Sequence, residues 1–421
     1  MFILYDIAFL IFAAAYLPYL LIRGKGREGF CSRFGFFPLA LPQALKGKKT
    51  IWIHAVSVGE VLAVLNLIRV VRERLPEYTI VLSTVTSTGN QLAGSKLKDE
   101  AVVIYAPVDF SWVVRRYIKI IRPQMYICAE TEIWPNLYSF LRAGRIPIVL
   151  INGRISDRAF AGYRKIPFVM THILKCVRLF CMQSRLDADR IIRLGADRER
   201  VRVAGNLKFD DLSGTAALEK KDLGFKDKDQ LFIAGSTHPG EEEIVVRVYQ
   251  RLVIEFPDLR LVIAPRHAHR ADEIVVLVND NGLKPVKFSQ LPGIGIDPNA
   301  VVVVDTIGHL RDLYGLADVV FVGKSLKVGG GQNMLEPLSL GKATVVGPMT
   351  QNFRDVIQIF AKTGALSQIS NEDELFSTMR DLLSDPRRRN ALGLSARQMI
   401  REHQGATART VNWIVTTLQK Q

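Results

Sequence analysis

The segment His54-Ala55-Val56-Ser57-Val58-Gly59-Glu60 places a carboxylate where an α/β protein can use one. The apolar run 50–53 before it is typical of a buried parallel strand, and the apolar run 61–68 after it is typical of a helix. Open α/β sheets bind their ligands at the carboxyl ends of strands. Glu60 is therefore either a site residue or a glutamate that complements the dipole of its own helix.

Two further carboxylates, Glu130 and Glu132, follow the apolar run 125–128. Carboxylates directly after a buried strand cost free energy unless they are hydrogen-bonded or functional. Arg154 follows the next apolar run along the chain, and Lys208 lies at the end of the first half. These side chains are further candidates for a site near the strand ends of the first half.

Three polar loops in the second half follow three apolar runs and are suited to an anion. The glycine triplet 329–331 precedes a predicted helix, so the backbone can approach a ligand and the helix N-terminus can attract negative charge. Arg266, beside His267, ends another strand and can bind phosphate or carboxylate with two donors. Ser236 lies in the third loop. The convergence of three loops on one sheet edge is more specific than any one of them.

Several enzyme classes are disfavoured because their motifs are missing. The chain has no Gly-x-x-x-x-Gly-Lys-Ser/Thr loop, no Gly-x-Gly-x-x-Gly after the first strand and no Gly-x-Ser-x-Gly elbow. The Asp-x-Asp pairs at 187/189 and 227/229 are expected to be solvated acids rather than metal ligands. The four cysteines form no Cys-x-x-Cys pair and are expected to be buried free thiols in a reducing compartment.

Apolar runs alternate with predicted helices along the chain, which is typical of parallel, doubly wound sheets. The polar stretch 211–228 interrupts this pattern, which then restarts. We predict a Rossmann-like domain over 31–210, a linker over 211–228, a second Rossmann-like domain over 229–395, and a C-terminal helix over 396–421. The first domain is a possible packing partner for that helix. Two such domains in series leave a cleft between their strand ends.

The first 30 residues are unusual. Residues 2–22 are nearly all apolar, interrupted by Asp6 and Pro18, and basic residues follow directly. The segment has about the length needed to cross a bilayer, and a helix lying in the membrane interface or buried in a core is the alternative. The basic residues on its C-terminal side leave the body of the protein in the cytoplasm. We expect residues 1–30 to form a membrane anchor or interfacial helix.

The formal net charge is +15, and all of the excess lies in the first half. Residues 1–210 contain 31 lysines and arginines against 16 acids, whereas residues 211–421 contain 25 of each. A one-sided basic surface indicates an anionic partner: nucleic acid, an anionic membrane surface or an anionic substrate. The basic residues form no stripe with interleaved aromatics, which disfavours nucleic acid.

Five motifs, in order, resemble the 3-deoxy-D-manno-octulosonic acid (Kdo) transferases of lipopolysaccharide synthesis. With the apolar N-terminus, the resemblance spans nearly the whole chain. The motifs are residues 54–60 (His-Ala-Val-Ser-Val-Gly-Glu), 130–136 (Glu-Thr-Glu-Ile-Trp-Pro-Asn), 205–208 (Gly-Asn-Leu-Lys), 264–267 (Ala-Pro-Arg-His) and 330–337 (Gly-Gly-Gln-Asn-Met-Leu-Glu-Pro).

This resemblance implies a GT-B glycosyltransferase fold, with two Rossmann-like domains facing a cleft, the acceptor domain first and the nucleotide-sugar domain second. It implies transfer from CMP-Kdo to a lipid A precursor (lipid IVA), with inversion at the anomeric carbon. It also implies a position at the cytoplasmic face of the inner membrane, in contact with anionic lipid. Neither a cofactor nor an active-site metal is expected.

The resemblance also assigns roles to residues. Glu60 takes the general-base position and would remove the proton from the acceptor hydroxyl as its oxygen attacks the anomeric carbon. Because a helix N-terminus lowers the pKa of a carboxylate, Glu60 is expected to be ionised at neutral pH. The supporting residues on the acceptor side are Ser57, Gly59, Glu130, Glu132 and Arg154. The donor-binding residues are Lys208, Ser236, Arg266, His267, Gly330, Gly331, Asn333 and Glu336.

Two positions depart from the family's usual pattern. Gln332 stands where a histidine is more usual, so no proton can be taken up there. Lys324 stands where a glycine is more usual, and it either contacts phosphate or faces solvent. Two other hypotheses stay open: a GT-B glycosyltransferase at the membrane that uses another nucleotide sugar, and a membrane-tethered nucleic-acid-binding protein.

Overall fold

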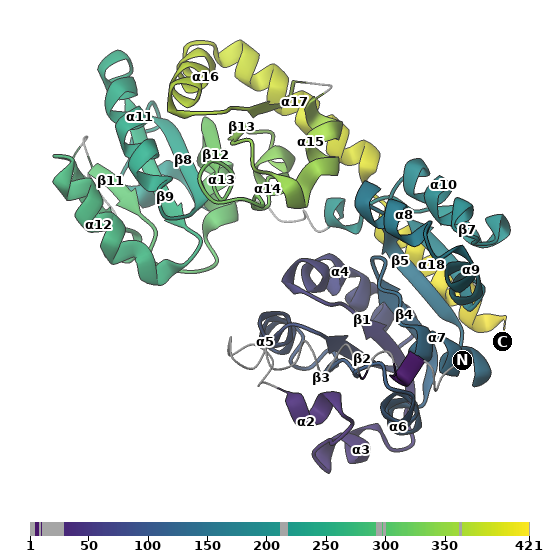
Figure 1. The fold of residues 1–421 in the computed structure, drawn as a ribbon. Helices are drawn as coiled ribbons and strands as arrows, with labels where there is room; N and C mark the ends of the chain where they lie inside the picture. The colour runs from purple at the N-terminus through teal and green to yellow at the C-terminus, as the bar shows by residue number, and fades with distance from the viewer. Residues whose placement is uncertain are drawn as a thin grey trace. The chain divides into compact units, whose positions relative to one another are not determined.

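The computed structural model describes residues 5–7, 10, 29–210, 218–291, 297, 300–361 and 364–420. The chain divides into two compact units: residues 1–211 with 403–421 form unit 1, and residues 212–402 form unit 2. Each unit is built on one parallel seven-stranded sheet, and helices cover its faces (Figure 1).

The sheet of unit 1 has the strand order β3-β2-β1-β4-β5-β6-β7. The order reverses between β1 and β4, where His54 pairs with Cys128. In open α/β sheets a ligand crevice lies at such a switch point, outside the carboxyl ends of the two strands. The strands are β1 (Lys49–His54), β2 (Tyr78–Thr84), β3 (Val102–Tyr105), β4 (Pro123–Ala129), β5 (Ile148–Gly153), β6 (Val177–Met182) and β7 (Val201–Val203).

Strand β1 is continuously apolar because helices bury both faces of the sheet. Trp52 packs into one core, whereas Ile51 and Ile53 pack into the other, and all three are fully buried. The helices of unit 1 are α2 (Phe30–Arg33), α3 (Ala40–Leu45), α4 (Val58–Arg74), α5 (Ser87–Lys96), α6 (Ser111–Ile121), α7 (Pro135–Ala143), α8 (Asp157–Tyr163), α9 (Pro167–Leu174), α10 (Arg185–Arg193) and α18 (Ala406–Gln419).

The C-terminal helix α18 belongs to unit 1 and packs against α4. Asp210 holds the start of this helix, because its carboxylate accepts hydrogen bonds from the N–H groups of Gly405 and Thr407. Arg74 of α4 also donates to the Asn412 side chain at 3.3 Å. The end of the chain thus completes one core of the first sheet.

The sheet of unit 2 has the strand order β10-β11-β9-β8-β12-β13-β14, and its order reverses between β8 and β12. The strands are β8 (Gln230–Thr237), β9 (Leu259–Pro265), β10 (Lys284–Lys287), β11 (Ala300–Val303), β12 (Val319–Val322), β13 (Ala343–Val346) and β14 (Leu366–Gln368). The helices are α11 (Glu242–Glu255), α12 (Ala271–Asp280), α13 (Leu310–Leu316), α14 (Leu335–Ser339), α15 (Arg354–Ala361), α16 (Glu372–Ser384) and α17 (Pro386–His403), which runs to the boundary with unit 1.

Most of the predicted N-terminal anchor lies outside the described residues. Asp6 is described, and its carboxylate accepts hydrogen bonds from the Ser111 N–H at 3.1 Å and the Asn136 side-chain amide at 2.7 Å. The acid that interrupts the apolar run therefore bonds to the first turns of α6 and α7. Among the described helices, none combines the length and the hydropathy needed to cross a bilayer.

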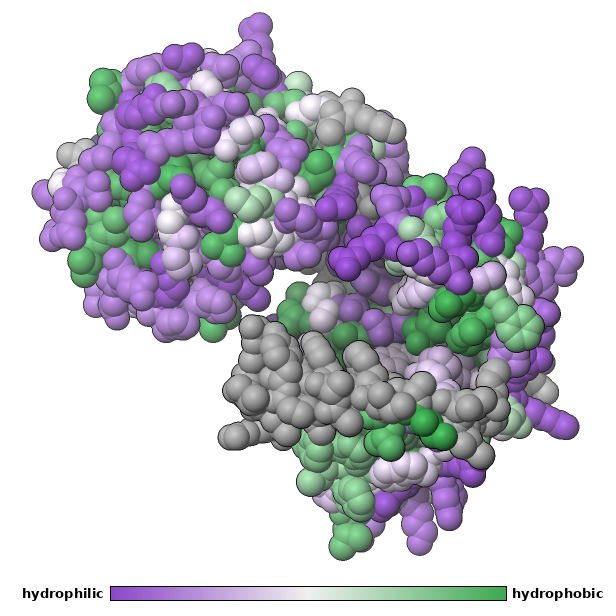
Figure 2. Space-filling view, viewed as in Figure 1, coloured by the Kyte–Doolittle hydropathy of each residue, from purple (hydrophilic) through white to green (hydrophobic). Residues whose placement is uncertain are grey.

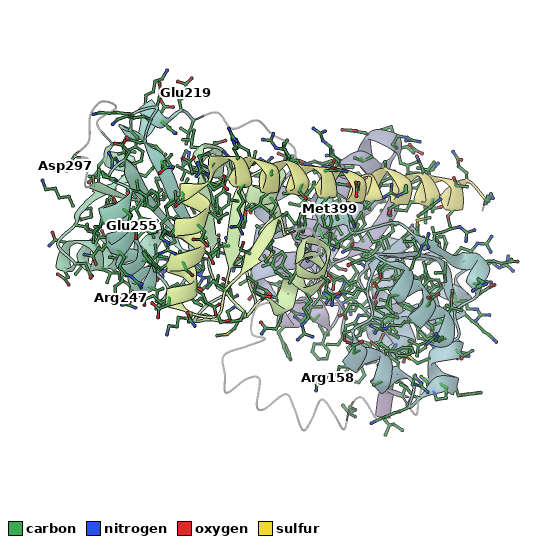
Figure 3. All side chains as sticks on the ribbon, turned by 90° about the horizontal axis from the view of Figure 1, so that it is seen from above. Arg158, Glu219, Arg247, Glu255, Asp297 and Met399 are labelled. Carbon is green, nitrogen blue, oxygen red and sulfur yellow. The ribbon has the colours of Figure 1, made fainter. Side chains whose placement is uncertain are left out.

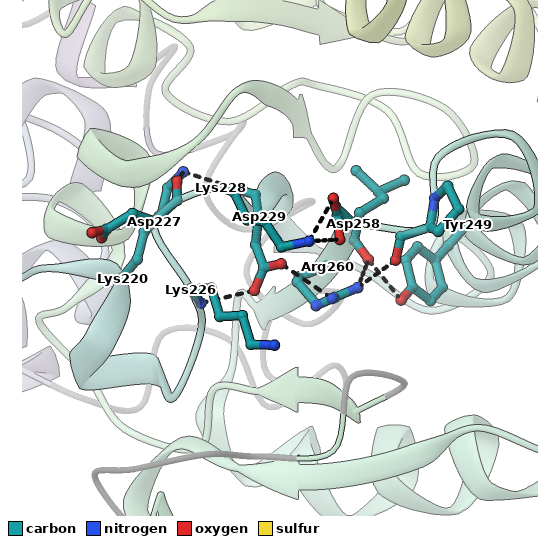
Figure 4. A network of polar contacts seen from close by, with 10 residues as sticks. Lys220, Lys226, Asp227, Lys228, Asp229, Tyr249, Asp258 and Arg260 are labelled. Atoms are coloured by element: carbon teal, nitrogen blue, oxygen red, sulfur yellow. Dashed lines mark hydrogen bonds and ion pairs between the residues drawn. The ribbon is translucent and has the colours of Figure 1, made fainter.

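Two acids that were expected to be solvated are buried instead. The Asp187 carboxylate accepts the Ile155 N–H at 2.8 Å, and Asp229 pairs with Arg260 at 3.1 Å (Figure 4). Burial is possible because these donors replace water. All four cysteines are free as expected, but Cys31 is exposed rather than buried.

The Asp229–Arg260 pair should hold unit 2 together. The two side chains are 3% and 6% exposed, and Asp229 also accepts the Lys226 N–H at 2.8 Å. Asp229→Asn leaves the Arg260 charge buried without its partner, so we expect unit 2 to lose about 3 kcal/mol of unfolding free energy, measured by chemical denaturation. Asp258→Asn is the matched control, because it breaks the exposed ion pair with Lys228. Equal unfolding curves for the two variants would contradict this assignment.

Candidate active site

Glu60 lies in the first turn of α4, directly after β1 and thus at the switch point of unit 1. Its Oε2 accepts the Val56 N–H at 2.6 Å, and its Oε1 accepts the Ser57 hydroxyl at 3.2 Å. The residue is only 9% exposed. Two donors are fewer than the roughly four lone-pair sites of a carboxylate. Glu60 therefore retains the capacity to accept a further proton.

The loop after β2 braces this turn. Val85 and Thr86 both donate their N–H groups to the Val56 carbonyl at 3.0 Å. Gly89 lets α5 approach closely, since a Cβ there would lie 3.3 Å from the carbonyl carbon of Ser57. These residues are uncharged and form no recognisable motif, so the sequence analysis missed them.

Gly59 leaves open space beside Glu60. A Cβ at this position would meet no atom within 4 Å, and the backbone there does not need a positive φ. The packing of the described residues therefore gives no reason for a glycine. A glycine at position 59 is explained if a ligand must come close to the backbone here.

Glu130 and Glu132 follow β4, on the other side of the switch point. Glu130 has a φ of 57°, which is uncommon for a residue other than glycine, and its N–H donates to the Ile151 carbonyl at 2.9 Å. Both carboxylates repel the charge on Glu60. The structure thus brings the three predicted carboxylates of unit 1 together.

The protonation of Glu60 differs from the expectation. Burial raises its pKa from 4.5 to about 7, which outweighs the Val56 hydrogen bond, and repulsion from Glu130 and Glu132 raises it further. The prediction that the helix N-terminus keeps Glu60 fully ionised is therefore wrong, because desolvation is the larger effect. Burial also raises the pKa of Glu132.

His54, the last residue of β1, is a buried and neutral ring beside the site. Its Nδ1 lies 2.9 Å from the Ser83 hydroxyl, which also accepts the Trp52 indole N–H at 2.8 Å. Burial lowers the pKa of His54 to about 4, so the imidazole carries no charge at neutral pH. The most basic-looking side chain of the first motif therefore cannot compensate the charge of Glu60.

Arg154 and Lys208 lie in loops after β5 and β7 of the same unit. The Thr131 hydroxyl donates to the Arg154 carbonyl and accepts the Arg154 N–H at 3.3 Å, which joins the loops after β4 and β5. Lys208 lies in the short 3-10 helix Leu207–Phe209, which packs against α4. Neither contact fixes a role for the charged ends of these side chains.

Unit 2 gathers a second cluster at the ends of β8 and β9. Ser236 has a φ of 55°, and the Arg266 N–H donates to the Thr237 carbonyl at 3.0 Å. The rings of His238 and His267 lie 6.2 Å apart. Burial lowers the pKa of both histidines. For His238 it outweighs the Ser236 carbonyl and Glu241, which raise the pKa, and for His267 nearby cations lower the pKa further, so both rings are neutral at neutral pH.

The glycine loop before α14 has the unusual backbone that glycine permits. Gly330 and Gly331 have φ values of 121° and 77°. Their N–H groups are already bonded, however: Gly330 donates to the Met349 carbonyl at 3.0 Å, and Gly331 donates to the Lys324 carbonyl at 2.7 Å. These two N–H groups are therefore used within the protein. The close approach of a ligand to this loop stays a prediction.

Asn333 and Glu336 bond to each other at the start of α14. The Asn333 amide donates to the Glu336 carboxylate at 2.8 Å, and its oxygen accepts the Leu335 N–H at 3.2 Å. Tyr314 lies between this pair and the end of β8: it is electrostatically coupled to Glu336, and a Cβ on Gly235 would lie 2.1 Å from its hydroxyl. Within the described part of the chain, no group of three acids, histidines or cysteines could hold a metal ion.

The raised pKa of Glu60 predicts a pH-dependent cost in stability. The folded chain retains a proton between pH 4.5 and about 7 that the unfolded chain has lost, so the stability contributed by this group falls as pH rises through that window. Glu60→Gln removes this cost: its amide oxygen can still accept the Val56 N–H, and its NH2 group can donate to the Ser57 oxygen. We expect it to add roughly 2–3 kcal/mol at pH 8 and almost nothing at pH 4.5, measured by denaturant titration. The exposed Glu73 of the same helix is the control: a gain for Glu73→Gln equal to that for Glu60→Gln would refute the assignment.

Comparisons with known proteins bear on both units. Residues 28–211 match the family model described as 3-deoxy-D-manno-octulosonic-acid transferase (kdotransferase). The 3-deoxy-D-manno-octulosonic acid transferase of Haemophilus influenzae is 31% identical over 400 residues, which cover 94% of this chain and 92% of that protein.

Solved structures confirm the predicted fold class, α/β of the GT-B type with two doubly wound domains. A UDP-N-acetylglucosamine 2-epimerase from Listeria monocytogenes, described as putative, superposes with a TM-score of 0.58 at 10% identity, covering 89% of this chain and 98% of that one. MurG of Acinetobacter baumannii superposes with a TM-score of 0.56 at 13% identity, covering 89% of this chain and all of that one. At these identities the likeness concerns the fold alone. With the match to the Haemophilus influenzae transferase along nearly its full length, the predicted family is confirmed: the chain belongs to the Kdo transferases, a family of glycosyltransferases.

Proposed function

We propose that this protein transfers Kdo from CMP-Kdo to a sugar hydroxyl of a lipid A precursor, with inversion at the anomeric carbon and with Glu60 as the general base. Membership of the Kdo transferase family supports the transferred sugar. The observation that carries the proposal is the half-satisfied Glu60 carboxylate at the switch point of unit 1, whose pKa is raised to about 7.

The proposed step is a single displacement. The acceptor hydroxyl oxygen attacks the anomeric carbon of Kdo, its proton passes to a Glu60 oxygen, and the bond from that carbon to the CMP phosphate oxygen breaks. CMP leaves with the bonding electrons. Attack on the face opposite the leaving group inverts the anomeric centre.

A general base works best when its pKa lies near the working pH. Desolvation gives Glu60 such a pKa, and the nearby Glu130 and Glu132 raise its proton affinity further. Val56 and Ser57 hold the two carboxylate oxygens in place, and the open space at Gly59 gives an acceptor hydroxyl room to approach. Glu130 and Glu132 then act as supporting residues that tune this base.

The surface of unit 1 supports the proposed acceptor and location. Its basic excess suits an acceptor that carries phosphates and lies in an anionic leaflet. Exposed charged side chains such as Arg158 project from this unit (Figure 3). Hydrophobic groups also reach its surface (Figure 2). Leu39 and Phe168 are 83% and 84% exposed. We therefore place the enzyme at the cytoplasmic face of the inner membrane.

Replacement of the proposed base tests the mechanism. Glu60→Gln preserves the shape of the side chain but accepts no proton, so we expect the rate of Kdo transfer to fall by about 10²–10⁴-fold. CMP affinity should be unchanged, because that ligand is assigned to unit 2. Glu73→Gln, on the exposed face of the same helix, should keep full activity. Retention of normal turnover by the Glu60 variant would remove this residue from catalysis.

The pH profile supplies a second test. Only the ionised form of Glu60 can act as a base, so kcat/KM should fall about tenfold per pH unit below the pKa of about 7 and level off above it. Glu130→Gln removes one source of repulsion and should move the inflection to lower pH. An inflection that stays in place in both Glu130→Gln and Glu132→Gln would argue against the proposed tuning.

Direct product analysis tests the donor and the acceptor. A lipid A precursor incubated with CMP-Kdo and the protein should gain mass in Kdo increments, as detected by mass spectrometry. Thermal shift with free nucleotides should show stabilisation by CMP and not by UMP. Selective stabilisation by the uridine nucleotide, without mass gain from CMP-Kdo, would favour another nucleotide sugar instead.

A further inference from the structure

Lys324 occupies the switch point of unit 2. It follows β12, which pairs with β8, and Val322 lies opposite Gly235 in that pairing. Its φ of 56° is in the left-handed region that favours glycine. A lysine pays roughly 1 kcal/mol or more for this conformation. Such a strained residue at a strand end needs a reason.

Glu241 fixes the backbone of Lys324. The Glu241 side chain is fully buried, and its carboxylate accepts the N–H groups of His238, Lys324, Ser325 and Leu326 at 2.7–3.0 Å. This carboxylate ties the loop after β8 to the loop after β12. The Lys324 main chain is therefore held at both ends, since its carbonyl also accepts the Gly331 N–H.

The Lys324 side chain runs along the glycine loop towards the two histidines. A Cβ built on Gly330 would lie 3.6 Å from the Cε of Lys324. The positive charge of Lys324 contributes to the lowered pKa values of both His238 and His267, although burial is the larger cause. The ammonium group thus lies where the loops after β8, β9 and β12 meet.

Few other groups in this cluster can supply positive charge at neutral pH. The two histidines are neutral, and the N–H groups of Gly330 and Gly331 are used within the protein. Helix α14 has only five residues, and the N–H of its first residue, Leu335, is already bonded to the Asn333 side chain. Arg270, which also acts on His267, is paired with Glu242 and Glu273. Arg266 and Lys324, which follow β9 and β12, remain as cations at these strand ends. No carboxylate lies within ion-pair distance of the Lys324 ammonium among the described residues.

We propose that Lys324 binds the phosphate of the nucleotide donor, held in position by Glu241 and the glycine loop. This role rests on the proposed function, because it takes CMP-Kdo as the donor. A phosphate oxygen would accept a charge-assisted hydrogen bond from Nζ, and the neutral side chains around it would add directional donors. Lys324 is a binding residue here, and Glu241 is its positioning residue.

The test compares two ligands that differ by the phosphate, CMP and cytidine, by isothermal titration calorimetry on the full chain. In Lys324→Met, CMP binding should weaken by about tenfold or more, while cytidine binding stays the same. Lys324→Gly provides a second variant that suits the positive φ and should behave likewise. Lys327→Met removes the same charge from an exposed position three residues on and should leave both affinities unchanged.

The outcomes separate this inference from the proposed function. If the wild type binds CMP no better than cytidine, the assigned donor is wrong and the role of Lys324 falls with it. If the wild type prefers CMP and both Lys324 variants retain that preference, only the role of Lys324 is overturned. A Glu241→Gln variant that keeps cytidine binding but loses the preference for CMP supports the positioning role, and one that keeps the preference overturns it.

Discussion

A carboxylate is buried where the first strand of each unit leads into a helix, and the number of hydrogen-bond donors around it determines its role. Each unit has such an acid after its first strand: Glu60 after β1 and Glu241 after β8. Glu241 accepts four backbone N–H groups, whereas Glu60 accepts one N–H and one hydroxyl. The Glu241 carboxylate is saturated with donors and ties two loops together. The Glu60 carboxylate has fewer donors than it could accept, and its pKa is raised by burial.

Backbone strain is also found at the ends of strands. Among the described residues, four with positive φ other than glycine lie at or just after the carboxyl ends of strands: Glu130, Asn152, Ser236 and Lys324. Each conformation costs of order 1 kcal/mol or more and persists because neighbouring bonds hold it. The Glu130 N–H bonds to Ile151 and the Lys324 N–H bonds to Glu241. The chain turns sharply at these points, which aims side chains across the sheet edge rather than along a continuing strand.

The sequence predicted the elements that burial alone determines. Strands such as β1 and β4 are continuous apolar runs because both faces of a parallel sheet are covered, so their ends, and the motifs that follow them, could be located. The sequence did not reveal the short strand β7, because none of its three residues is buried and no apolar run marks it. Burial of polar side chains could not be predicted, because it depends on hydrogen-bond partners from other segments. Asp187 and Asp229 look like solvated acids until those partners are known.

The candidate site shows the same division between pattern and environment. The sequence motifs identified Glu60 and the glycine loop. The pKa of Glu60 and the hydrogen bonds of the loop, however, depend on contacts with residues distant in the sequence. Desolvation of Glu60 comes from packing around the turn, including the loop after β2, and the N–H of Gly330 is taken by Met349. Helix-dipole and loop rules describe an isolated segment. They fail where tertiary contacts supply or withhold the hydrogen-bond partners.

Charge is used at two length scales in unit 1. Its basic excess acts over the surface, and salt screens that field within about 8 Å under physiological conditions. The carboxylates at the switch point respond instead to burial and to one another, which raises the pKa of Glu60 although the unit as a whole is positive. A field strong enough to hold an anionic acceptor can therefore coexist with a site that keeps a proton acceptor near neutrality. The separation requires that the basic side chains stay at the surface, and the described contacts of Glu60 are a backbone N–H, a hydroxyl and two carboxylates, with no cation among them.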